Sequence, residues 1–450
     1  MLNVRRIASV SLALVICFGL FAIAAYAQPA NQFVIASPYE GVDWAAFGQY
    51  KAAFHVHTTQ SDGAASVADT VRDHYNKGFD ILTITDHNVL TDGWGDHMAA
   101  EEIAAIYAGT YRGPYPGLLS THRRQQQNGM ISIPATNEQS RTDHICSYWA
   151  PFNNESSATM QDTLGRIGSY SGLAILNHPG RYTGGVAGGS AGAATSNDPA
   201  NIAKYVELFR EFDSAVGMEI INKLDDESKS DRILWDNILM QLMPEGRGVW
   251  GFSNDDSHFI DAIGYSFNVM LMPELTANAA KASMQNGAFY AVSRVARPEG
   301  VNTGLFGLWP ISPGNFSTLY MFNQSTPGIV NIIAENDSIT ITGTDYSRIE
   351  WIADGRVIAT GPRLDLNAHQ DSINHNYVRA QLISGTGIAF TQPFGIWAAD
   401  EDAPQASAPG AVAPPPTGDS RTLLFGLLAL MLLSGMGLIV FAGRKKTSAQ

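Results

Sequence analysis

Cysteine is nearly absent from this sequence of 450 residues, which contains only Cys17 and Cys146. Cys17 falls within a segment that has the features of a removable leader, so the remaining chain would carry a single thiol. An internal disulfide is therefore excluded. The folded chain must be stabilised by burial of its hydrophobic core, which its length permits.

Basic residues are also scarce. The chain has 28 Lys and Arg residues against 42 Asp and Glu residues, which gives a formal net charge of −14. A broad nucleic-acid-binding surface requires a basic face, so this balance argues against one and leaves room for a small basic pocket. The sequence also shows no internal repeat.

The first 27 residues have the composition of a secretory signal peptide. Arg5 and Arg6 give a positive start, residues 7–24 are an apolar run, and Ala25-Tyr26-Ala27 fits the small-x-small cleavage pattern. An uncleaved membrane anchor is the alternative interpretation, but the cleavage pattern favours removal before Gln28.

A second apolar run predicts a membrane anchor near the other end. Residues 423–442 carry no charge over twenty positions, enough for a helix that crosses a bilayer. A basic tail (443–450) follows, and such tails are retained in the cytoplasm. Residues 403–420 are rich in Pro and Ala and predict an extended linker. We therefore expect an exported protein whose folded part lies outside the cytoplasmic membrane. Pro415-Pro416-Thr417-Gly418 also resembles a degenerate cell-wall sorting signal, but a plain anchor is the simpler interpretation.

Strands and helices are expected to alternate from about residue 51 to residue 293. Such alternation is typical of an α/β barrel, whose chemistry lies at the carboxyl ends of its strands. The predicted strands are residues 51–56, 79–84, 130–134, 145–149, 172–177, 217–222, 248–253, 265–272 and 288–293. The predicted helices are residues 66–77, 96–108, 159–170, 201–212, 231–243 and 276–286.

After about residue 312 the apolar pattern changes to period two, as in Ser338–Thr342 and Arg348–Ile352, with turn residues between the runs. This pattern predicts a small antiparallel β-sandwich. The expected division of the chain is a signal peptide (1–27), a barrel (31–311), a β-sandwich (312–402), a linker (403–420), a transmembrane helix (423–442) and a tail (443–450).

Polar residues gather where the predicted strands end. His55 and His57 lie two positions apart at the end of the first strand, so their side chains point to one side while Phe54 and Val56 point to the other. Later strand ends bring further imidazoles and carboxylates. The candidate metal ligands are His55, His57, Asp62, His87, Glu138, His144, His178, Asp256 and His258.

This mixture of ligand types suits zinc, manganese or iron and disfavours calcium and magnesium, which prefer oxygen ligands alone. A single tetrahedral ion takes four ligands. Nine candidates therefore imply two or three divalent transition metal ions, with Glu138 as a candidate bridge between two of them.

The motifs that carry these residues resemble the PHP (polymerase and histidinol phosphatase) superfamily of metal-dependent phosphoesterases. They occur in the order of that family over about residues 50–295. The matching motifs are His55–Gly63 (HVHTTQSDG), Ile84–Asn88 (ITDHN), Glu138–His144, Asn177–Arg181 (NHPGR) and Asp255–His258 (DDSH), and Asn286–Tyr290 resembles the closing helix-to-strand turn of the family.

The resemblance implies a distorted (β/α)7, TIM-like barrel with a trinuclear metal centre. Carried over position by position, it assigns three ligand sets, with Asp62 standing where some members have His and with Asp256, rather than Asp255, keeping the spacing to His258. The implied sets are His55, His57, Glu138 and Asp256 for the first ion, Glu138, His144 and His178 for the second, and Asp62, His87 and His258 for the third.

The activity that the resemblance implies is hydrolysis of phosphate esters by a metal-activated water. Paired ions lower the pKa of a bridging water and hold the phosphoryl oxygens. Glu138, Asp256 and Arg181 are the predicted catalytic residues, and Arg181 and Arg141 are candidates to pair with a substrate phosphate. The expected partners are a phosphorylated small molecule or short oligonucleotide as substrate, and the membrane through the C-terminal helix.

Two other interpretations stay open. The same ions could activate water toward an amide or a lactone, which would make the chain a hydrolase of another bond. Alternatively the barrel is an inactive scaffold and the β-sandwich a surface binding module, although the complete ligand set argues against this. No candidate ligand lies beyond His258, so the β-sandwich is expected to be separable from catalysis.

Five further residues stand near these motifs. Cys146 lies in an apolar stretch and is expected to be a core thiol rather than a nucleophile. His74 lies within a predicted helix and is expected on the surface, and Asp86 is expected to orient an imidazole. Glu219 and Asn222, at another strand end, are candidates to line the pocket.

Overall fold

A computed structural model of the chain describes residues 32–113, 128–154, 158–183, 194–223, 230–296 and 325–399. These residues all belong to one unit, which spans residues 1–409. The predicted signal peptide, linker, transmembrane helix and tail lie outside the described residues, as does the predicted boundary between residues 311 and 312.

No helix in the described part of the chain is long and apolar enough to cross a membrane. The longest helix with described bounds has 13 residues, whereas crossing the hydrocarbon core takes about 20. The predicted C-terminal membrane anchor, and the location outside the cytoplasmic membrane that depends on it, are therefore not supported by the described part of the chain.

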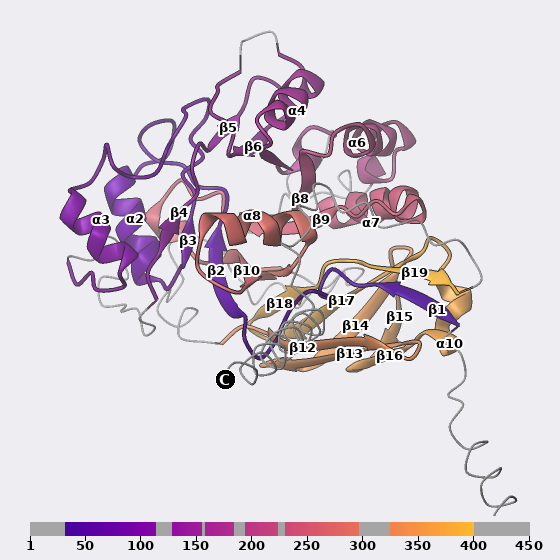
Figure 1. The fold of residues 1–450 in the computed structure, drawn as a ribbon. Coiled ribbons are helices and arrows are strands. Elements are labelled where there is room, and N and C mark those ends of the chain that lie inside the picture. The colour runs from indigo at the N-terminus through magenta and orange to yellow at the C-terminus, as the bar shows by residue number, and fades with distance from the viewer. Residues whose placement is uncertain are drawn as a thin grey trace, which may run out of the picture. The chain divides into compact units, whose positions relative to one another are not determined.

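Side-chain caps begin several of the helices. Ser66 accepts a hydrogen bond from the backbone N–H of Asp69 and starts one helix, which ends before Gly78 at φ +79°. Thr159 starts another with a capping box that includes Asp162. The helices are α2 (Val67–Asn76), α3 (Ala100–Tyr107), α4 (Met160–Ser169), α6 (Pro199–Glu211), α7 (Asp231–Leu242) and α8 (Ala277–Asn286), as Figure 1 shows.

Two sheets carry the candidate ligands. In the first, β2 (Gly48–Ala53), β3 (Ile81–Leu82) and β4 (Ile131–Ser132) are parallel, and β10 (Ser266–Met272) and β11 (Phe289–Ser293) continue the sheet antiparallel beyond β2. In the second, β7 (Leu173–Leu176), β8 (Ala215–Asn222) and β9 (Trp250–Asn254) are parallel, whereas β5 (Asn137–Gln139) and β6 (Ile145–Tyr148) are antiparallel neighbours. The predicted mixed α/β fold is confirmed.

The two sheets meet just beyond their strand ends. Val56 forms a parallel bridge with Ser257, and His87 forms one with Glu138. These bridges bring the polar residues that follow each strand into one place. The antiparallel run β5–β6–β7 departs from a regular strand–helix repeat, so the described pairings do not establish a closed (β/α)7 barrel.

Aromatic side chains pack beneath the place where the two sheets meet. The rings of Phe54 and Tyr148 pack edge to face with centroids 5.9 Å apart, and Phe54 and Phe252 do so at 6.1 Å. The Tyr148 hydroxyl donates to the backbone oxygen of Phe54 over 2.6 Å. The alternation predicted for residues 54–57 therefore places apolar side chains below and imidazoles above.

The C-terminal strands pair antiparallel, as their period-two pattern predicts. One sheet has the order β12–β13–β16, and β1 pairs with β19, which lies beside it in Figure 1. The strands are β1 (Phe33–Ala36), β12 (Gly328–Glu335), β13 (Ser338–Thr344), β14 (Arg348–Ala353), β15 (Arg356–Thr360), β16 (Arg363–Asp365), β17 (Tyr377–Ser384), β18 (Gly387–Phe390) and β19 (Phe394–Ala398), and a short helix, α10 (Leu366–His369), follows β16.

These strands are joined closely to the sheets that carry the candidate ligands. β18 pairs with β11, so one sheet runs from one part into the other. Arg379 of β17 forms a buried bidentate ion pair with Asp236 of α7, at 2.8 and 2.6 Å. Gln392 hydrogen-bonds both backbone groups of Gly251 in β9, at 2.7 and 3.0 Å. These contacts join the C-terminal strands to the strands that carry the candidate ligands. The prediction that the β-sandwich is separable from catalysis concerns activity and stays a prediction.

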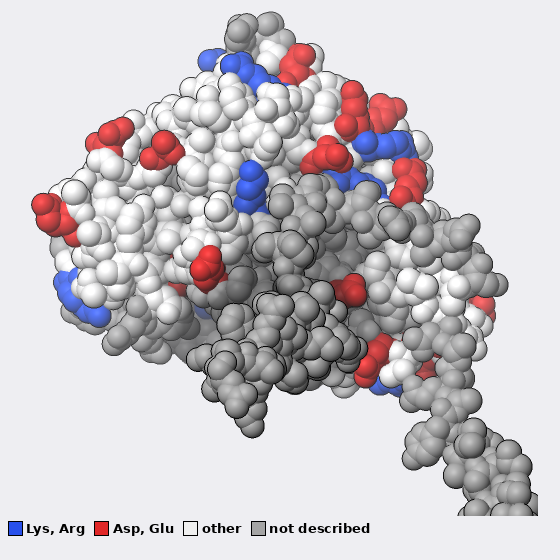
Figure 2. Space-filling view, in the orientation of Figure 1, with Lys and Arg blue, Asp and Glu red and all other residues white. Residues whose placement is uncertain are grey.

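Charged residues are interspersed on the outside of the described chain. On the face drawn in Figure 2, acidic and basic side chains lie among many neutral ones, and the described residues of that face form no extended patch of one sign. The concentrated charge of this protein lies instead in the buried groups at the strand ends.

Candidate metal centre

The nine sequence-predicted metal residues converge on one region. They follow the ends of β2, β3, β7 and β9, lie within β5, or precede β6. Their potential ligand atoms form four overlapping groups, and within each group the atoms lie within 4.8 Å of one another. The groups are His55, His57 and Asp256; His55, Glu138 and His178; His87, Glu138 and His144; and His57, Asp62, His87 and His258.

Glu138 lies at the centre of these groups. It is fully buried in the middle of β5, and its carboxylate faces five imidazoles contributed by four segments of the chain. Oε1 lies 3.0 Å from His144 Nδ1, 3.2 Å from His55 Nε2 and 3.7 Å from His178 Nε2, and Oε2 lies 2.6 Å from His87 Nδ1 and 3.5 Å from His57 Nε2. Each oxygen therefore serves a different set of rings, which is the disposition that a bridging carboxylate needs.

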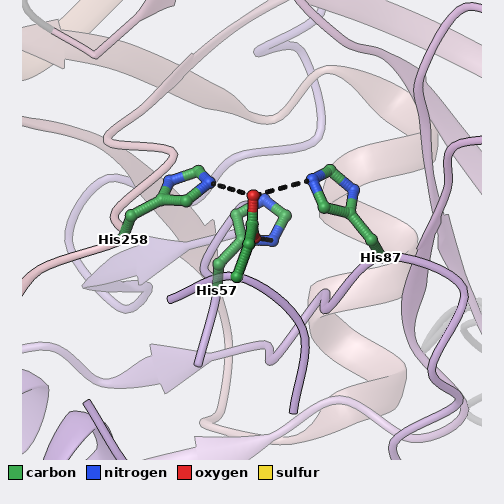
Figure 3. A group of neighbouring side chains, drawn as sticks. His57, His87 and His258 are labelled. Carbon is green, nitrogen blue, oxygen red and sulfur yellow. Dashed lines mark ion pairs between the residues drawn. The ribbon is translucent and has the colours of Figure 1, made fainter. Parts of the chain in front are cut away.

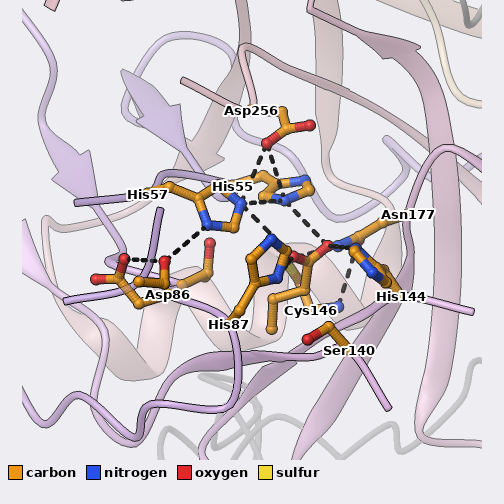
Figure 4. Close-up of polar contacts among 12 residues, drawn as sticks. His55, His57, Asp86, His87, Ser140, His144, Cys146, Asn177 and Asp256 are labelled. Atoms are coloured by element: carbon orange, nitrogen blue, oxygen red, sulfur yellow. Dashed lines mark hydrogen bonds and ion pairs between the residues drawn. The ribbon is translucent and has the colours of Figure 1, made fainter. Parts of the chain in front are cut away.

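His55 and His57 face each other through their Nε2 atoms, which are 3.0 Å apart, with Asp256 beside them in Figure 4. Oδ1 of Asp256 lies 3.3 and 3.1 Å from these two nitrogens. Neither this oxygen nor Oε2 of Glu138 accepts a hydrogen bond of acceptable geometry from any described residue. Buried acceptor atoms brought so close are costly unless a positive charge lies among them. The donor set therefore fits a cation held between imidazoles and carboxylates.

A second, more open group lies on the outer side. Figure 3 shows His87 and His258 pointing toward a common oxygen, with His57 behind. This oxygen is Oδ2 of Asp62, which is 3.5 Å from His87 Nε2 and 3.3 Å from His258 Nε2. The Asp62 side chain is 53% exposed, so this group opens to solvent while the Glu138 group does not.

The buried groups shift one another's pKa: burial lowers the pKa of His57, whereas the pKa of His55 is raised. Burial alone would lower the pKa of His55, but Asp256, Cys146, Glu138 and Glu219 outweigh it and raise the pKa well above its ordinary value. Burial alone would raise the pKa of Glu138, but His55 and neighbouring imidazoles outweigh it and hold the pKa well below the ordinary range. The pKa of Asp256 is lowered in the same way against its burial, first by His55. The pocket thus stabilises positive charge at its centre.

Two residues outside the nine hold the cluster in place. Asn177 donates through Nδ2 to Oε1 of Glu138 over 2.6 Å, which fixes the carboxylate. Asp86 accepts from the Thr58 N–H at 2.7 Å, the Thr58 hydroxyl at 2.6 Å and the Ser61 hydroxyl at 2.5 Å. Ser61 Oγ in turn lies 3.4 Å from Nδ1 of His57, so Asp86 holds the turn after His57 and reaches this imidazole through Ser61, in line with the expectation that it orients an imidazole.

Backbone conformation at the strand ends is unusual. His178, Asp256 and Lys223 have φ values of +28°, +45° and +51°, in the left-handed region that side chains rarely adopt. Such conformations persist only where the surroundings enforce them, and they cluster at functional sites. Behind His178, the Gly180 N–H donates to Oδ1 of Asp231 over 2.6 Å, and a Cβ at Gly180 would lie 2.3 Å from that oxygen.

The predicted arginines lie at the edge of the cluster. Arg181 is exposed, in the turn that follows His178, and its charge opposes the burial-driven rise in the pKa of Tyr182, whose ring packs against His144 and His178. Arg141 is exposed in the segment between Glu138 and His144. Neither arginine belongs to any of the four groups of ligand atoms.

Lys223 is a cation at the site that sequence reasoning missed. It follows β8, and its Nζ lies 3.3 Å from Oδ2 of Asp256 with 36% of the side chain exposed. A lysine directly after a predicted strand end, beside the residue Asn222 already considered for the pocket, was the available signal.

The structure also tests the predictions for Cys146 and His74, which are both buried. Cys146 is a core thiol as expected: it is fully buried, and burial raises its pKa to about 12, which removes the thiolate needed for nucleophilic attack. The surface position predicted for His74 is wrong. Its ring is buried, Nδ1 lies 2.8 Å from the Thr70 backbone oxygen, and the ring packs edge to face against Phe79.

No protein-family model matches the sequence, and no curated protein matches it significantly. Several solved structures are distantly similar. One is a two-domain protein containing a predicted PHP-like metal-dependent phosphoesterase from Bacteroides vulgatus, with 14% identity and a TM-score of 0.37 over 82% of this chain and 91% of that chain. PsfC from Pseudomonas syringae aligns with 11% identity and a TM-score of 0.30 over 50% of this chain and 84% of that chain. An amidohydrolase from Chromobacterium violaceum aligns with 16% identity and a TM-score of 0.27 over 46% of this chain and 87% of that chain. At TM-scores this low, these likenesses establish neither the fold nor the activity of this chain.

Proposed function

We propose that this protein is a metal-dependent hydrolase that cleaves phosphate esters and belongs to the PHP type, with a distorted (β/α)7 barrel around the site. The observation that carries the proposal is the set of buried acceptor atoms around Glu138. Oδ1 of Asp256 and Oε2 of Glu138 are buried acceptors without a hydrogen-bond donor among the described residues, and they lie beside the facing Nε2 atoms of two imidazoles, which supports a cation at this place.

The residues that would hold two or three divalent ions are the nine of the cluster. When bound, such ions supply a water of lowered pKa and neutralise the oxygens of a phosphoryl group. Glu138 is proposed to bridge two positions, because its two oxygens face different imidazoles. Asp256 is proposed to use Oδ1 as a ligand while Oδ2 stays engaged by Asn222 and Lys223.

Charge favours an anionic substrate over a neutral one. The cluster contains three ligand carboxylates, from Asp62, Glu138 and Asp256. Two or three divalent ions would bring four or six positive charges against these three carboxylates and the buried Glu219 behind His55, and Lys223 adds one more, so a phosphate ester would be attracted to the filled site. Lys223 and Arg181 would add to this attraction at the rim, and we propose that they bind substrate oxygens. A phosphorylated small molecule or short oligonucleotide is the proposed substrate.

The test uses the purified full chain, stripped of metal with a chelator and reloaded with manganese, zinc or iron(II). Hydrolysis of p-nitrophenyl phosphate, its bis-ester, and a panel of phosphorylated metabolites and short oligonucleotides is measured alongside p-nitrophenyl acetate and a lactone. We expect metal-dependent release of phosphate or of the alcohol from at least one phosphate ester. His97→Gln is the matched control, because His97 is an exposed histidine away from the cluster.

Two outcomes would contradict the proposal in different ways. A chain that binds metal and cleaves only the carboxylic ester or lactone would be a hydrolase of another bond. A chain that binds no transition metal under any loading condition would remove the metal-dependent mechanism altogether.

A further inference from the structure

Strand β8 contributes none of the nine ligands, yet its Glu219 lies behind two of them. The side chain is fully buried. Oε1 accepts hydrogen bonds from Nδ1 of His55 over 2.8 Å and from Nδ2 of Asn254 over 2.9 Å. Oε2 accepts from the backbone N–H of His178 over 2.9 Å and from Nδ2 of Asn222 over 2.9 Å. All four donors surround one carboxylate, so each of its oxygens is doubly satisfied.

We infer that Glu219 is the positioning residue of the metal centre. By accepting from Nδ1 of His55, it keeps the proton on that nitrogen and leaves Nε2 with a lone pair directed at the cluster. By accepting from the N–H of His178, it holds that residue in the left-handed conformation at φ +28°. This inference rests on the proposed function to the extent that the nine residues bind metal.

Glu219 is coupled to a third ligand through Asn222. The Nδ2 group of Asn222 donates to Oε2 of Glu219 and also lies 3.2 Å from Oδ2 of Asp256. Asp256 is thereby turned so that Oδ1 faces the imidazoles. One buried carboxylate on β8 thus fixes ligands that follow β2, β7 and β9.

If Glu219 served only the fold, its four hydrogen bonds would be sufficient. If it positions the ligands, its negative charge also acts on the imidazole of His55. A carboxylate behind an imidazole raises the basicity of the metal-facing nitrogen and fixes its tautomer, and loss of such a partner typically costs 10–100-fold in metal affinity. Gln at this position keeps the shape but offers one acceptor and one donor. Its amide could donate to Nδ1 of His55, which would move the proton to Nε2 and block the ligand atom.

The first measurement needs no variant of Glu219. In the zinc-loaded full chain, labelled with 15N at histidine, the ring nitrogens of His55 are assigned by their loss in His55→Asn. We expect Nε2 to carry the chemical shift of a metal-bound nitrogen and Nδ1 to carry a strongly downfield-shifted proton. Zinc on Nδ1 of His55, or no zinc on either nitrogen, would overturn the inference even if every variant failed to fold.

The second measurement compares Glu219→Gln and Glu219→Asp with Glu102→Gln. The Glu102 carboxylate, on α3, pairs with Arg72 of α2 and belongs to none of the four ligand groups. Zinc affinity is measured by competition with a chromophoric chelator. We expect about a 10–100-fold loss for Glu219→Gln with loss of the downfield His55 proton, a smaller loss for Glu219→Asp, and no change for Glu102→Gln. A folded Glu219→Gln variant with wild-type affinity and an unchanged His55 proton would overturn the inference.

The outcomes separate this inference from the proposed function. A chain that binds zinc through Nε2 of His55 and depends on Glu219, but cleaves no phosphate ester, would retain the positioning role and lose the phosphoesterase proposal. If the chain hydrolyses a phosphate ester and Glu219→Gln has unchanged zinc affinity, the phosphoesterase proposal is retained and the positioning role of Glu219 is lost.

Discussion

Glu138 carries more of the proposed chemistry than any other single residue, because both of its oxygens face imidazoles and Oε2 accepts no hydrogen bond of acceptable geometry from the described chain. A bridging carboxylate offsets the repulsion between two cations and sets their separation. A terminal imidazole, such as that of His258, serves only one position, so its loss should do less harm.

Glu138→Gln should therefore lose at least one metal equivalent and reduce turnover on the order of a hundredfold or more, since changes that only disturb ligand orientation already cost 10–100-fold. Metal content by elemental analysis and turnover on the best phosphate ester are the measurements. His97→Gln, an exposed histidine, should change neither. Full metal content and near-normal turnover in Glu138→Gln would show that this carboxylate is not the bridge.

The candidate ligands were accessible to sequence reasoning because each follows a predicted strand within a polar motif. Glu219 was named only as a candidate to line the pocket, and its positioning role was missed, since it lies inside the buried run Ala215–Asn222 and belongs to no motif. The signal that could have found it is the charge itself, because a glutamate within a buried strand needs partners. Burial of His74 could not be read from helical spacing alone, since the packing of Phe79 against its ring arises only in three dimensions.

His74 offers a test of stability against pH. Burial, together with the charges of Lys77 and Lys51, lowers its pKa to about 3, whereas an unfolded histidine has a pKa of about 6.5. The folded state therefore binds fewer protons between these values. The contribution of neutral His74 is complete above pH 6.5 and is lost as the pH falls toward 3.

We expect the unfolding free energy of His74→Gln, measured relative to wild type in metal-stripped protein, to rise by about 2 kcal/mol between pH 7 and pH 5. Urea denaturation at several pH values is the measurement. His97→Gln is the control, because that residue is exposed and should show no such trend. A constant difference across this range would mean that His74 is not held neutral in the folded chain.

At the scale of elements, the turn after β7 shows how a short segment places a ligand. The 3₁₀ turn Pro179–Arg181 begins at His178, and its Gly180 N–H donates to Asp231 at the start of α7. Helix caps such as Ser66 and Thr159 made the helices predictable within a few residues. β5 was not predicted, because a three-residue strand whose residues are all polar carries no periodic apolar signal.

Gly180→Ala should displace this turn, because the new Cβ would lie 2.3 Å from Oδ1 of Asp231. We expect metal affinity to fall by about 10-fold or more, since His178 would lose its orientation while the ligand atoms themselves remain. The matched control is Gly95→Ala, where an added Cβ meets nothing within 4 Å. Metal affinity is measured for both variants by competition with a chelator. Equal affinities would show that the turn accommodates the added methyl group without displacing His178.

At the scale of the whole molecule, the C-terminal strands are built into the part that carries the centre. Tyr39 connects them by donating to the Phe289 backbone oxygen and accepting from the Gln392 N–H, at 3.0 and 2.8 Å. The period-two pattern predicted antiparallel strands but not this union. β11 and β18 are far apart in the sequence, and the apolar pattern of either strand alone does not indicate that the two strands pair.

The Arg379–Asp236 pair is a buried, bidentate ion pair across this union. Both side chains are buried, and Tyr377 donates to the same carboxylate over 3.0 Å. Removing one member leaves the other as an uncompensated buried charge, which costs about 3–5 kcal/mol. The exposed pair between Arg210 and Glu245 has the same bidentate geometry, yet surface pairs contribute only about 0.2–1 kcal/mol.

Arg379→Met should therefore lower the free energy of unfolding by about 3–5 kcal/mol, and Arg210→Met by less than about 1 kcal/mol. Urea denaturation followed by fluorescence measures both. If the two parts unfold as one unit, the loss in Arg379→Met will appear in a single transition that includes the metal centre, so bound zinc will be released at the same urea concentration. Adding Asp236→Leu to Arg379→Met should recover much of the loss, because no charge is then left buried without its partner. Two separate transitions, with zinc retained through the first, would instead show that the C-terminal strands unfold independently of the centre.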